Sequence, residues 1–288
     1  MRRLALLILF AACLCPSLHA QGDDEISCYS YRQENTAFKK KLWEGYEISL
    51  GPARNAAETE LACTAAIYNS AGRVVFRTSG FNVVFDQNLT GQDFDGDGKP
   101  DVVFRTDTGG GNHCCWGYVI FSLSPKPHKL FEIAMEGRVD FEKDKDGKMV
   151  IWTRVSVPGA FATSMAQRPF AAQVMRVKEG KLVDVTPEFC GSKDERLERG
   201  YLSPGDLNKL STVGDQGSAD NEGIISRLES RTAQHVFCHE YSEALKDINL
   251  WPAEKRVEVM SGLAEAFKDE YPEFVAKLEE FLNRDLTR

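Results

Sequence analysis

The pattern of apolar and polar positions divides the chain into two regions that differ in the periodicity of their apolar residues. From about residue 44 to 187, apolar residues come in short runs rich in Val, Ile and Phe, and the runs are separated by Gly, Asn, Asp and Pro. This pattern is typical of successive β-strands. The strands follow one another without helical segments between them, so we expect an antiparallel β structure rather than a helix-covered parallel sheet.

Ten strands can be placed in this first region. They are expected at residues 46–50, 61–68, 73–78, 81–85, 101–106, 118–123, 129–135, 149–155, 172–177 and 181–185. Turn-forming residues at 69–72 and at 179–180 each predict a hairpin between the strands that flank them.

After Cys190 the apolar residues recur at helical spacing. Following a polar linker at 214–223, one helix is expected over about 224–245, and further helical segments over 257–267 and 274–282, because the Pro residues at 252 and 272 interrupt the pattern. The predicted fold class is therefore α+β. A mainly antiparallel β domain at 21–191, either propeller-blade-like or sandwich-like, precedes a small helical domain of three or four helices at 192–288.

Residues 1–20 read as a signal peptide. Arg2 and Arg3 precede an apolar stretch at 4–14, and small residues at 17–20 lead to a cleavage point before Gln21. The apolar stretch is too short to span a bilayer and no later stretch is longer, so we expect a soluble product that is exported to the periplasm or secreted. The tetrapeptide ending in Cys13 resembles a weak bacterial lipoprotein box, which leaves a lipid anchor at Cys13 open.

The charge balance narrows the class of partner. The 288 residues include 35 Lys+Arg against 43 Asp+Glu, for a net charge of -8, without any long basic run. A protein that binds nucleic acid needs a surplus of Lys and Arg on one face. The composition therefore excludes nucleic acid and leaves an unknown protein or glycan as the partner.

The cysteine residues agree with export. Eight are present, and six remain after removal of the signal peptide, an even number as expected in an oxidising compartment. Six cysteines allow about fifteen pairings. We expect Cys28 with Cys63 and Cys190 with Cys238, while Cys114 and Cys115 either form a vicinal bridge or pair with the others.

The segment with the clearest chemistry is an Asp-rich loop at residues 93–101. Asp93, Asp95 and Asp97 occupy alternate positions, Gly98 permits a sharp turn, and Asp101 follows at position nine. Hard cations such as Ca²⁺ bind six to eight oxygen ligands, and closely spaced carboxylates repel one another unless a cation lies between them. The predicted calcium ligands are the side chains of Asp93, Asp95, Asp97 and Asp101 and the main-chain carbonyl of Lys99.

This loop is not an EF-hand, because Phe104 stands at position twelve, where an EF-hand has a bidentate Glu. The stretch resembles the calcium loops of the FG-GAP and VCBS repeat families, in which such a turn joins two strands of a β-propeller blade. The chain is too short for a full propeller and shows one good copy of the motif. Together with the segment Gly-Gly-x-x-His-Cys-Cys at 109–115, it also resembles a group of uncharacterised exported bacterial proteins over residues 80–125, a resemblance that implies no activity.

A degenerate second copy of the loop lies at residues 142–147. Val150 stands where the acid at position nine is expected, and two lysines dilute the negative charge. We interpret this segment as a polar hairpin at an equivalent place in the fold, with cation binding as the alternative.

Two further groups of residues suggest metal chemistry. His113, Cys114 and Cys115 can bind Zn²⁺ or copper, although adjacent strand residues face opposite sides and a disulfide role for the cysteines is favoured. His235 and His239 lie four residues apart and would share one face of a helix. The sequence lacks the Glu of the zinc-protease motif His-Glu-x-x-His, so we interpret these histidines as a surface or interface pair.

The sequence favours an exported calcium-binding β domain that acts as a binding or structural module at the cell envelope. It does not settle whether the protein is an enzyme, and a role without catalysis is favoured. Two alternatives remain open: a secreted hydrolase whose catalytic residues are unrecognised, and a metal or redox protein that uses His113, Cys114 and Cys115.

Overall fold

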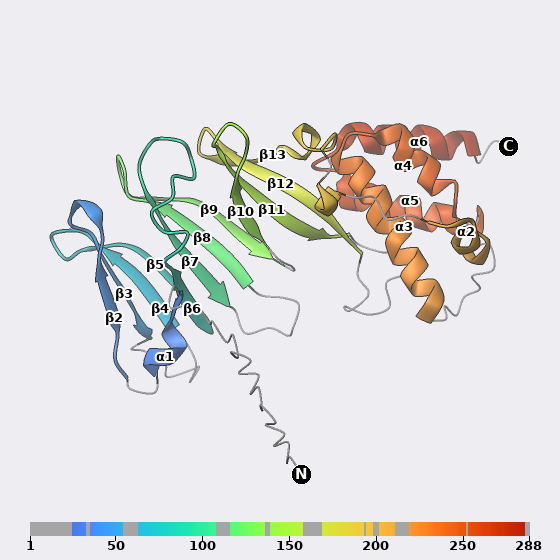
Figure 1. The fold of residues 1–288 in the computed structure, drawn as a ribbon. Helices are drawn as coiled ribbons and strands as arrows, with labels where there is room; N and C mark the ends of the chain where they lie inside the picture. Colours follow the sequence, from blue (N-terminus) through green and yellow to red (C-terminus); the bar gives the residue numbers. More distant parts are fainter. Residues whose placement is uncertain are drawn as a thin grey trace, which may run out of the picture.

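The structure is a computed structural model. It describes residues 25–32, 35–53, 63–107, 116–135, 139–157, 169–192, 194–197, 202–210, 219–251 and 253–285. The described part is α+β, as predicted, with three open antiparallel sheets and a helical unit at the C-terminal end (Figure 1).

The first sheet is a four-stranded meander in which each strand pairs with the next along the chain. Its strands are β2 (Phe38–Lys41), β3 (Glu47–Pro52), β4 (Cys63–Tyr68) and β5 (Val74–Gly80). The alternation within β3 shows why it folds this way: Ile48 and Leu50 are fully buried, whereas Glu47 and Ser49 point to the opposite, accessible face.

The second sheet is a meander of the same kind with one added edge strand. Its order is β1-β6-β7-β8-β9. The strands are β1 (Glu25–Ser27), β6 (Asn82–Asp86), β7 (Asp101–Asp107), β8 (Trp116–Ser122) and β9 (His128–Met135). A short helix, α1 (Cys28–Arg32), follows β1, and the disulfide from Cys28 to Cys63 ties this segment to β4.

The third sheet is again a four-stranded meander. It consists of β10 (Asp140–Lys143), β11 (Met149–Ser156), β12 (Phe170–Lys178) and β13 (Lys181–Asp184). The helical unit follows. It consists of α2 (Pro204–Leu210), α3 (Ala219–Phe237), α4 (Tyr241–Ile248), α5 (Ala253–Phe267) and α6 (Pro272–Asp285).

The three sheets and the helices are arranged as consecutive layers (Figure 1). One apolar cluster, which includes Ile67 and Phe104, joins the first sheet to the second. A second cluster, which includes Ile120 and Ile151, joins the second sheet to the third. A third cluster unites the helices and includes Val157 and Ala171 at the ends of the third sheet.

Polar contacts and a disulfide fix the helical unit to the third sheet. The side-chain amide of Gln234 in α3 accepts a hydrogen bond from the Ala172 amide at 2.9 Å and donates to the Ala172 carbonyl at 3.0 Å. The hydroxyl of Tyr271 donates a short hydrogen bond to the carboxylate of Asp184 at the end of β13. The disulfide between Cys190 and Cys238 covalently joins the same two regions.

The structure contains all ten predicted strands and both predicted hairpins, and both expected disulfides are present. Three strands were missed, namely β1, β2 and β10. Each is a short edge strand of three or four residues with little apolar content. An edge strand pairs on one side only and often carries charge, so its sequence shows no clear strand pattern.

The prediction of one helix over 224–245 was wrong in its continuity. α3 ends at Phe237 and α4 begins at Tyr241, because His239 adopts a left-handed backbone conformation (φ 58°) between them. The expected linker at 214–223 is also too long, since α3 already begins at Ala219.

Several predictions lie outside the described residues. These are the signal peptide at 1–20, the possible anchor at Cys13, and the group His113, Cys114 and Cys115. The boundary between domains 21–191 and 192–288 stays a prediction. Within the described ranges, no helix combines the length and apolar character needed to cross a membrane.

Candidate metal centre

The Asp-rich loop connects β6 to β7, and hydrogen bonds fix both of its ends. The carboxylate of Asp86, the last residue of β6, accepts hydrogen bonds from the amides of Asn88 (3.1 Å) and Leu89 (3.0 Å). At the other end the Asp101 amide donates to the Gln92 carbonyl at 2.8 Å. The loop therefore begins and ends at defined points of the second sheet.

The interior of the loop is a tight turn built around the Asp93 carboxylate. Its two oxygens accept hydrogen bonds from the amides of Gly96 (2.7 Å) and Gly98 (2.9 Å). Both glycines have left-handed backbone conformations, with φ of 82° and 80°. A Cβ at either position would meet no neighbouring atom within 4 Å, so the backbone conformation itself is what requires glycine here.

This turn brings three of the predicted ligands together. Carboxylate oxygens of Asp93, Asp95 and Asp101 lie within 4.8 Å of one another. Oxygens on opposite sides of a Ca²⁺ ion, each about 2.4 Å from it, lie about 4.8 Å apart. The spacing therefore suits a calcium ion between them.

Asp97 is arranged differently, and the part expected of the Lys99 carbonyl stays a prediction. The carboxylate of Asp97 accepts a hydrogen bond from the Lys99 amide at 2.7 Å and does not belong to the converging group. The structure thus reduces the carboxylates that meet at one point from four to three.

Asp101 is the unusual member of the group because it is fully buried. Its Oδ2 accepts a hydrogen bond from the Phe94 amide at 2.9 Å, whereas its Oδ1 has no hydrogen-bond partner in the described structure. Ser122 lies opposite Asp101 on β8; its hydroxyl donates to the Ser124 carbonyl at 3.1 Å and also lies near enough to Asp101 to lower the pKa of that carboxyl. A buried carboxylate oxygen without a partner is energetically costly.

The pKa values in the loop reflect this environment. Burial raises the pKa of Asp101 to about 7; the Phe94 amide and the Ser122 hydroxyl oppose this rise, and repulsion from Asp95 and Asp93 adds to it. The pKa of Asp95 is also raised, first by burial and then by repulsion from Asp97 and Asp93. Among the residues that the structure describes, no Lys or Arg forms an ion pair with any of the three carboxylates. Within the described ranges, no Lys or Arg side chain therefore neutralises this negative charge.

The side chain between the first two ligands anchors the loop in the core. Phe94 is 3 % exposed and packs edge-on against Phe141 of β10, with ring centroids 5.6 Å apart. Phe131 of β9 lies on another side of the same ring. The converging carboxylates are thus directly connected to the apolar layer between the second and third sheets.

The degenerate copy of the loop occupies the equivalent place in the third sheet, between β10 and β11. The local geometry repeats: the Asp144 carboxylate accepts the Asp146 amide (2.9 Å), as Asp95 accepts the Asp97 amide (3.1 Å). Gly147 has a φ of 77°, close to that of Gly98. We call residues 93–101 the first loop and residues 142–150 the sister loop.

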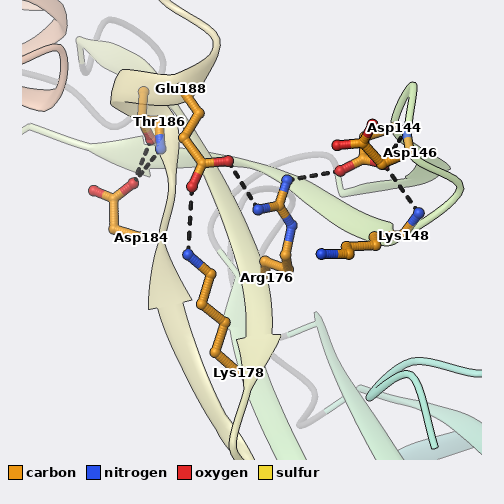
Figure 2. Close-up of polar contacts among 8 residues, drawn as sticks. All are labelled: Asp144, Asp146, Lys148, Arg176, Lys178, Asp184, Thr186 and Glu188. Atoms are coloured by element: carbon orange, nitrogen blue, oxygen red, sulfur yellow. Dashed lines mark hydrogen bonds and ion pairs between the residues drawn. The ribbon is translucent and has the colours of Figure 1, made fainter.

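The sister loop differs because it contains its own positive charge. The guanidinium of Arg176 in β12 lies 2.7 Å from the Asp144 carboxylate and 2.8 Å from that of Glu188 (Figure 2). Burial tends to raise the pKa of Asp144, but the Lys148 and Asp146 amides and Arg176 together lower it below its ordinary value. The Asp144 carboxylate is therefore stabilised in its charged form, in contrast to Asp95 and Asp101.

The strand register explains the difference between the two loops. Asp101 on β7 lies opposite Ser122 on β8. In the third sheet Ile151 lies opposite Met175, so the next pair along the two strands is Val150 with Arg176. The sister loop thus has Val where the first loop has a buried acid, and Arg where the first loop has Ser.

The sequence analysis did not identify Arg176. It attributed the weaker negative charge of the sister loop to the lysines within that loop. The available signal was a lone Arg inside the apolar strand sequence of β12, but its partner Asp144 is 32 residues away. Only the strand pairing brings the two side chains together.

The predicted pairing of His235 and His239 does not occur on a common helical face. His239 lies beyond the end of α3, and its ring packs near Tyr241 at 5.6 Å. His235 is 6 % exposed rather than on the surface, and it contacts the carboxylates of Glu240 (2.7 Å) and Asp247 (3.6 Å). These contacts connect α3 to α4 and offer a structural role for His235.

Comparison of the chain with family models, with curated proteins and with solved structures gave no match.

Proposed function

We propose that the protein is an exported calcium-binding β protein and that the first loop holds the ion. The ligands would be Asp93, Asp95 and Asp101, with Asp97 and the Lys99 carbonyl as the further oxygens expected from the sequence. The observation that carries this proposal is the buried Asp101 Oδ1, which accepts no hydrogen bond within the described structure and belongs to a group of carboxylates spaced for a cation.

The sister loop supports the same proposal as an internal comparison. It shares the turn geometry of the first loop, but it supplies a guanidinium to its acids. This comparison indicates that the turn needs a positive charge close to its carboxylates. In the first loop, where the protein supplies none among the described residues, an external divalent cation would fill the same need.

Calcium would act here on structure rather than on a substrate. Binding to Asp93 and Asp95 would fix the loop on both sides of Phe94, and binding to Asp101 would connect the loop to the start of β7. The ion would therefore stabilise the apolar layer between the second and third sheets by binding the folded state preferentially. This role agrees with a binding or structural module at the cell envelope.

Export, to the periplasm or out of the cell, is part of the proposal. Two disulfides agree with an oxidising compartment, and residues 1–20 have the features of a signal peptide. The four-stranded meanders, with a loop after the first strand of each of the last two, also agree with the resemblance to propeller blades of the FG-GAP and VCBS type.

Calorimetric titration of the metal-free protein with Ca²⁺, together with thermal melts with and without EGTA, tests the proposal. We expect one calcium equivalent per chain and a lower melting temperature in EGTA. Asp101→Asn and Asp95→Ala should remove both effects. Asp146→Asn in the sister loop is the matched control and should retain both; equal melts with calcium and with EGTA would refute the calcium site.

A further inference from the structure

The first sheet lies at the end of the molecule away from the helices (Figure 1). Its outer face carries a hollow. The hollow has a volume of about 960 Å³ and is lined by the accessible side chains of β2, β3, β4 and β5. The opposite face of the same sheet is apolar and packs against the second sheet. The hollow is therefore separate from the candidate metal centre.

The register of the four strands explains the shape. One row across the sheet consists of Lys39, Ser49, Ala66 and Arg77, each opposite the next. The two central side chains are small and form a low floor, while the two outer side chains are long and form the rims. Three strand spacings of about 4.8 Å separate the rims, which gives a trough ~14 Å wide.

The rims carry positive charge that no described residue neutralises by a direct contact. Within the described structure, Lys39, Lys41 and Arg77 have neither a hydrogen bond nor an ion pair from their side chains. Glu47 also lines the hollow, beside Lys41, so three cations face one acid. In a chain of net charge -8, this local excess of positive charge favours an anionic ligand.

The side chains of the floor indicate which class of anion fits. Ser49 and Thr64 offer hydroxyl groups, and Tyr68 offers an aromatic ring with a hydroxyl. Protein interfaces usually centre on large apolar or aromatic anchors in a well-packed patch. Leu42 and Tyr46 also line the hollow, but both are half-buried and pack against the apolar cluster below the sheet. None of the exposed large apolar side chains identified in the described structure (Tyr29, Val74, Phe81, Trp116 and Val257) lines it.

We propose that this hollow binds an acidic oligosaccharide. Its carboxylates would contact the cationic rims at Lys39, Lys41 and Arg77, and its hydroxyls would form hydrogen bonds with the polar floor. The inference rests on the binding role proposed above and gives that role a ligand class. It does not require the calcium site.

The test measures binding of a defined oligogalacturonate to the full-length mature protein, in EGTA so that calcium cannot bridge ligand and protein. A neutral malto-oligosaccharide of the same length and poly-L-glutamate are the comparison ligands. We expect binding of oligogalacturonate that exceeds binding of both comparison ligands and that weakens as ionic strength rises.

Two variants and one control assign the binding to the hollow. Lys39→Glu combined with Arg77→Glu should weaken oligogalacturonate binding by about tenfold or more, because attraction at both rims becomes repulsion. Ser49→Phe keeps every charge but fills the floor, and it should weaken binding to a similar degree. Lys143→Glu combined with Lys145→Glu makes the same charge change on exposed positions of the third sheet and should leave binding unchanged.

Equal binding of the neutral oligosaccharide would overturn the inference, and so would equal weakening in the control variant. Tighter binding of poly-L-glutamate would assign the hollow to an acidic protein instead. Because these assays contain EGTA, their failure is distinguishable from failure of the calcium site, which the calcium titration measures without any saccharide.

Discussion

The ionisation of Asp101 connects pH, calcium and stability, and it leads to a quantitative prediction. Burial raises the pKa of this carboxyl to about 7 in the metal-free folded protein, against an ordinary value of 3.8. The folded state therefore holds a proton that the unfolded chain has already lost between about pH 4 and pH 7. Stability of the metal-free protein should fall as the pH rises through this window.

The size of the effect follows from the same two pKa values. A difference of one pKa unit corresponds to about 1.4 kcal/mol, so the full penalty for the charged carboxylate is at most about 4 kcal/mol. Between about pH 5 and pH 8 the expected loss in the free energy of unfolding is roughly 2–3 kcal/mol. Asp101→Asn cannot ionise and should lack this loss, so the metal-free variant should be the more stable protein at pH 8.

Calcium should narrow the difference in stability between the two proteins at pH 8. The ion binds the ionised carboxylate, and at a concentration about 100 times the Kd it adds about 2.7 kcal/mol to the stability of the wild type. Urea unfolding in EGTA and in calcium, at pH 5 and pH 8, measures all of these quantities, and Asp146→Asn serves as the control. The reasoning is refuted if wild type and Asp101→Asn have parallel pH profiles in EGTA, or if calcium stabilises both equally.

Three further predictions concern other contacts. Val150→Asp combined with Arg176→Ser should convert the sister loop into a second calcium site, raising the stoichiometry by titration from one to two, whereas Val150→Asp alone should leave it at one. Replacing both Cys190 and Cys238 by Ser should lower the free energy of unfolding by about 2–4 kcal/mol and increase protease cleavage near α3; an unchanged cleavage pattern would contradict the docking role of this disulfide. Tyr271→Phe should cost about 1 kcal/mol, because it removes a donor from the half-buried Asp184 carboxylate, and denaturant unfolding that shows no loss would contradict this role.

The central strands could be predicted from the sequence because each has a neighbouring strand on both sides, and burial between these strands requires a run of apolar residues. β7 and β11 are buried in the middle of their sheets and read as apolar runs. β2 and β10 carry Lys and Glu because they lie at sheet edges, and their sequences do not differ from those of loops. The edges of sheets were therefore the part of the fold that local sequence did not reveal.

The sequence predicted the chemistry of the candidate metal centre, but it did not predict which of the acidic side chains converge there. The alternating acids indicated a cation-binding loop, but their spacing gave no reason to distinguish Asp97 from Asp101 as a ligand. The structure separates them, since the Asp97 carboxylate is engaged by a local amide and Asp101 is buried with a free oxygen. Burial of this kind depends on β8 and on the next sheet, which no short motif can encode.

The serial arrangement of the layers has a consequence for how the molecule loses its structure. The apolar clusters that join layers connect a sheet only to its immediate neighbour, and the last sheet to the helices. Unfolding of the layer at one end therefore does not directly remove contacts at the other end, as in repeat proteins whose units contact only adjacent units. Heating should melt the molecule stepwise, with a calorimetric trace broader than that of a single cooperative transition.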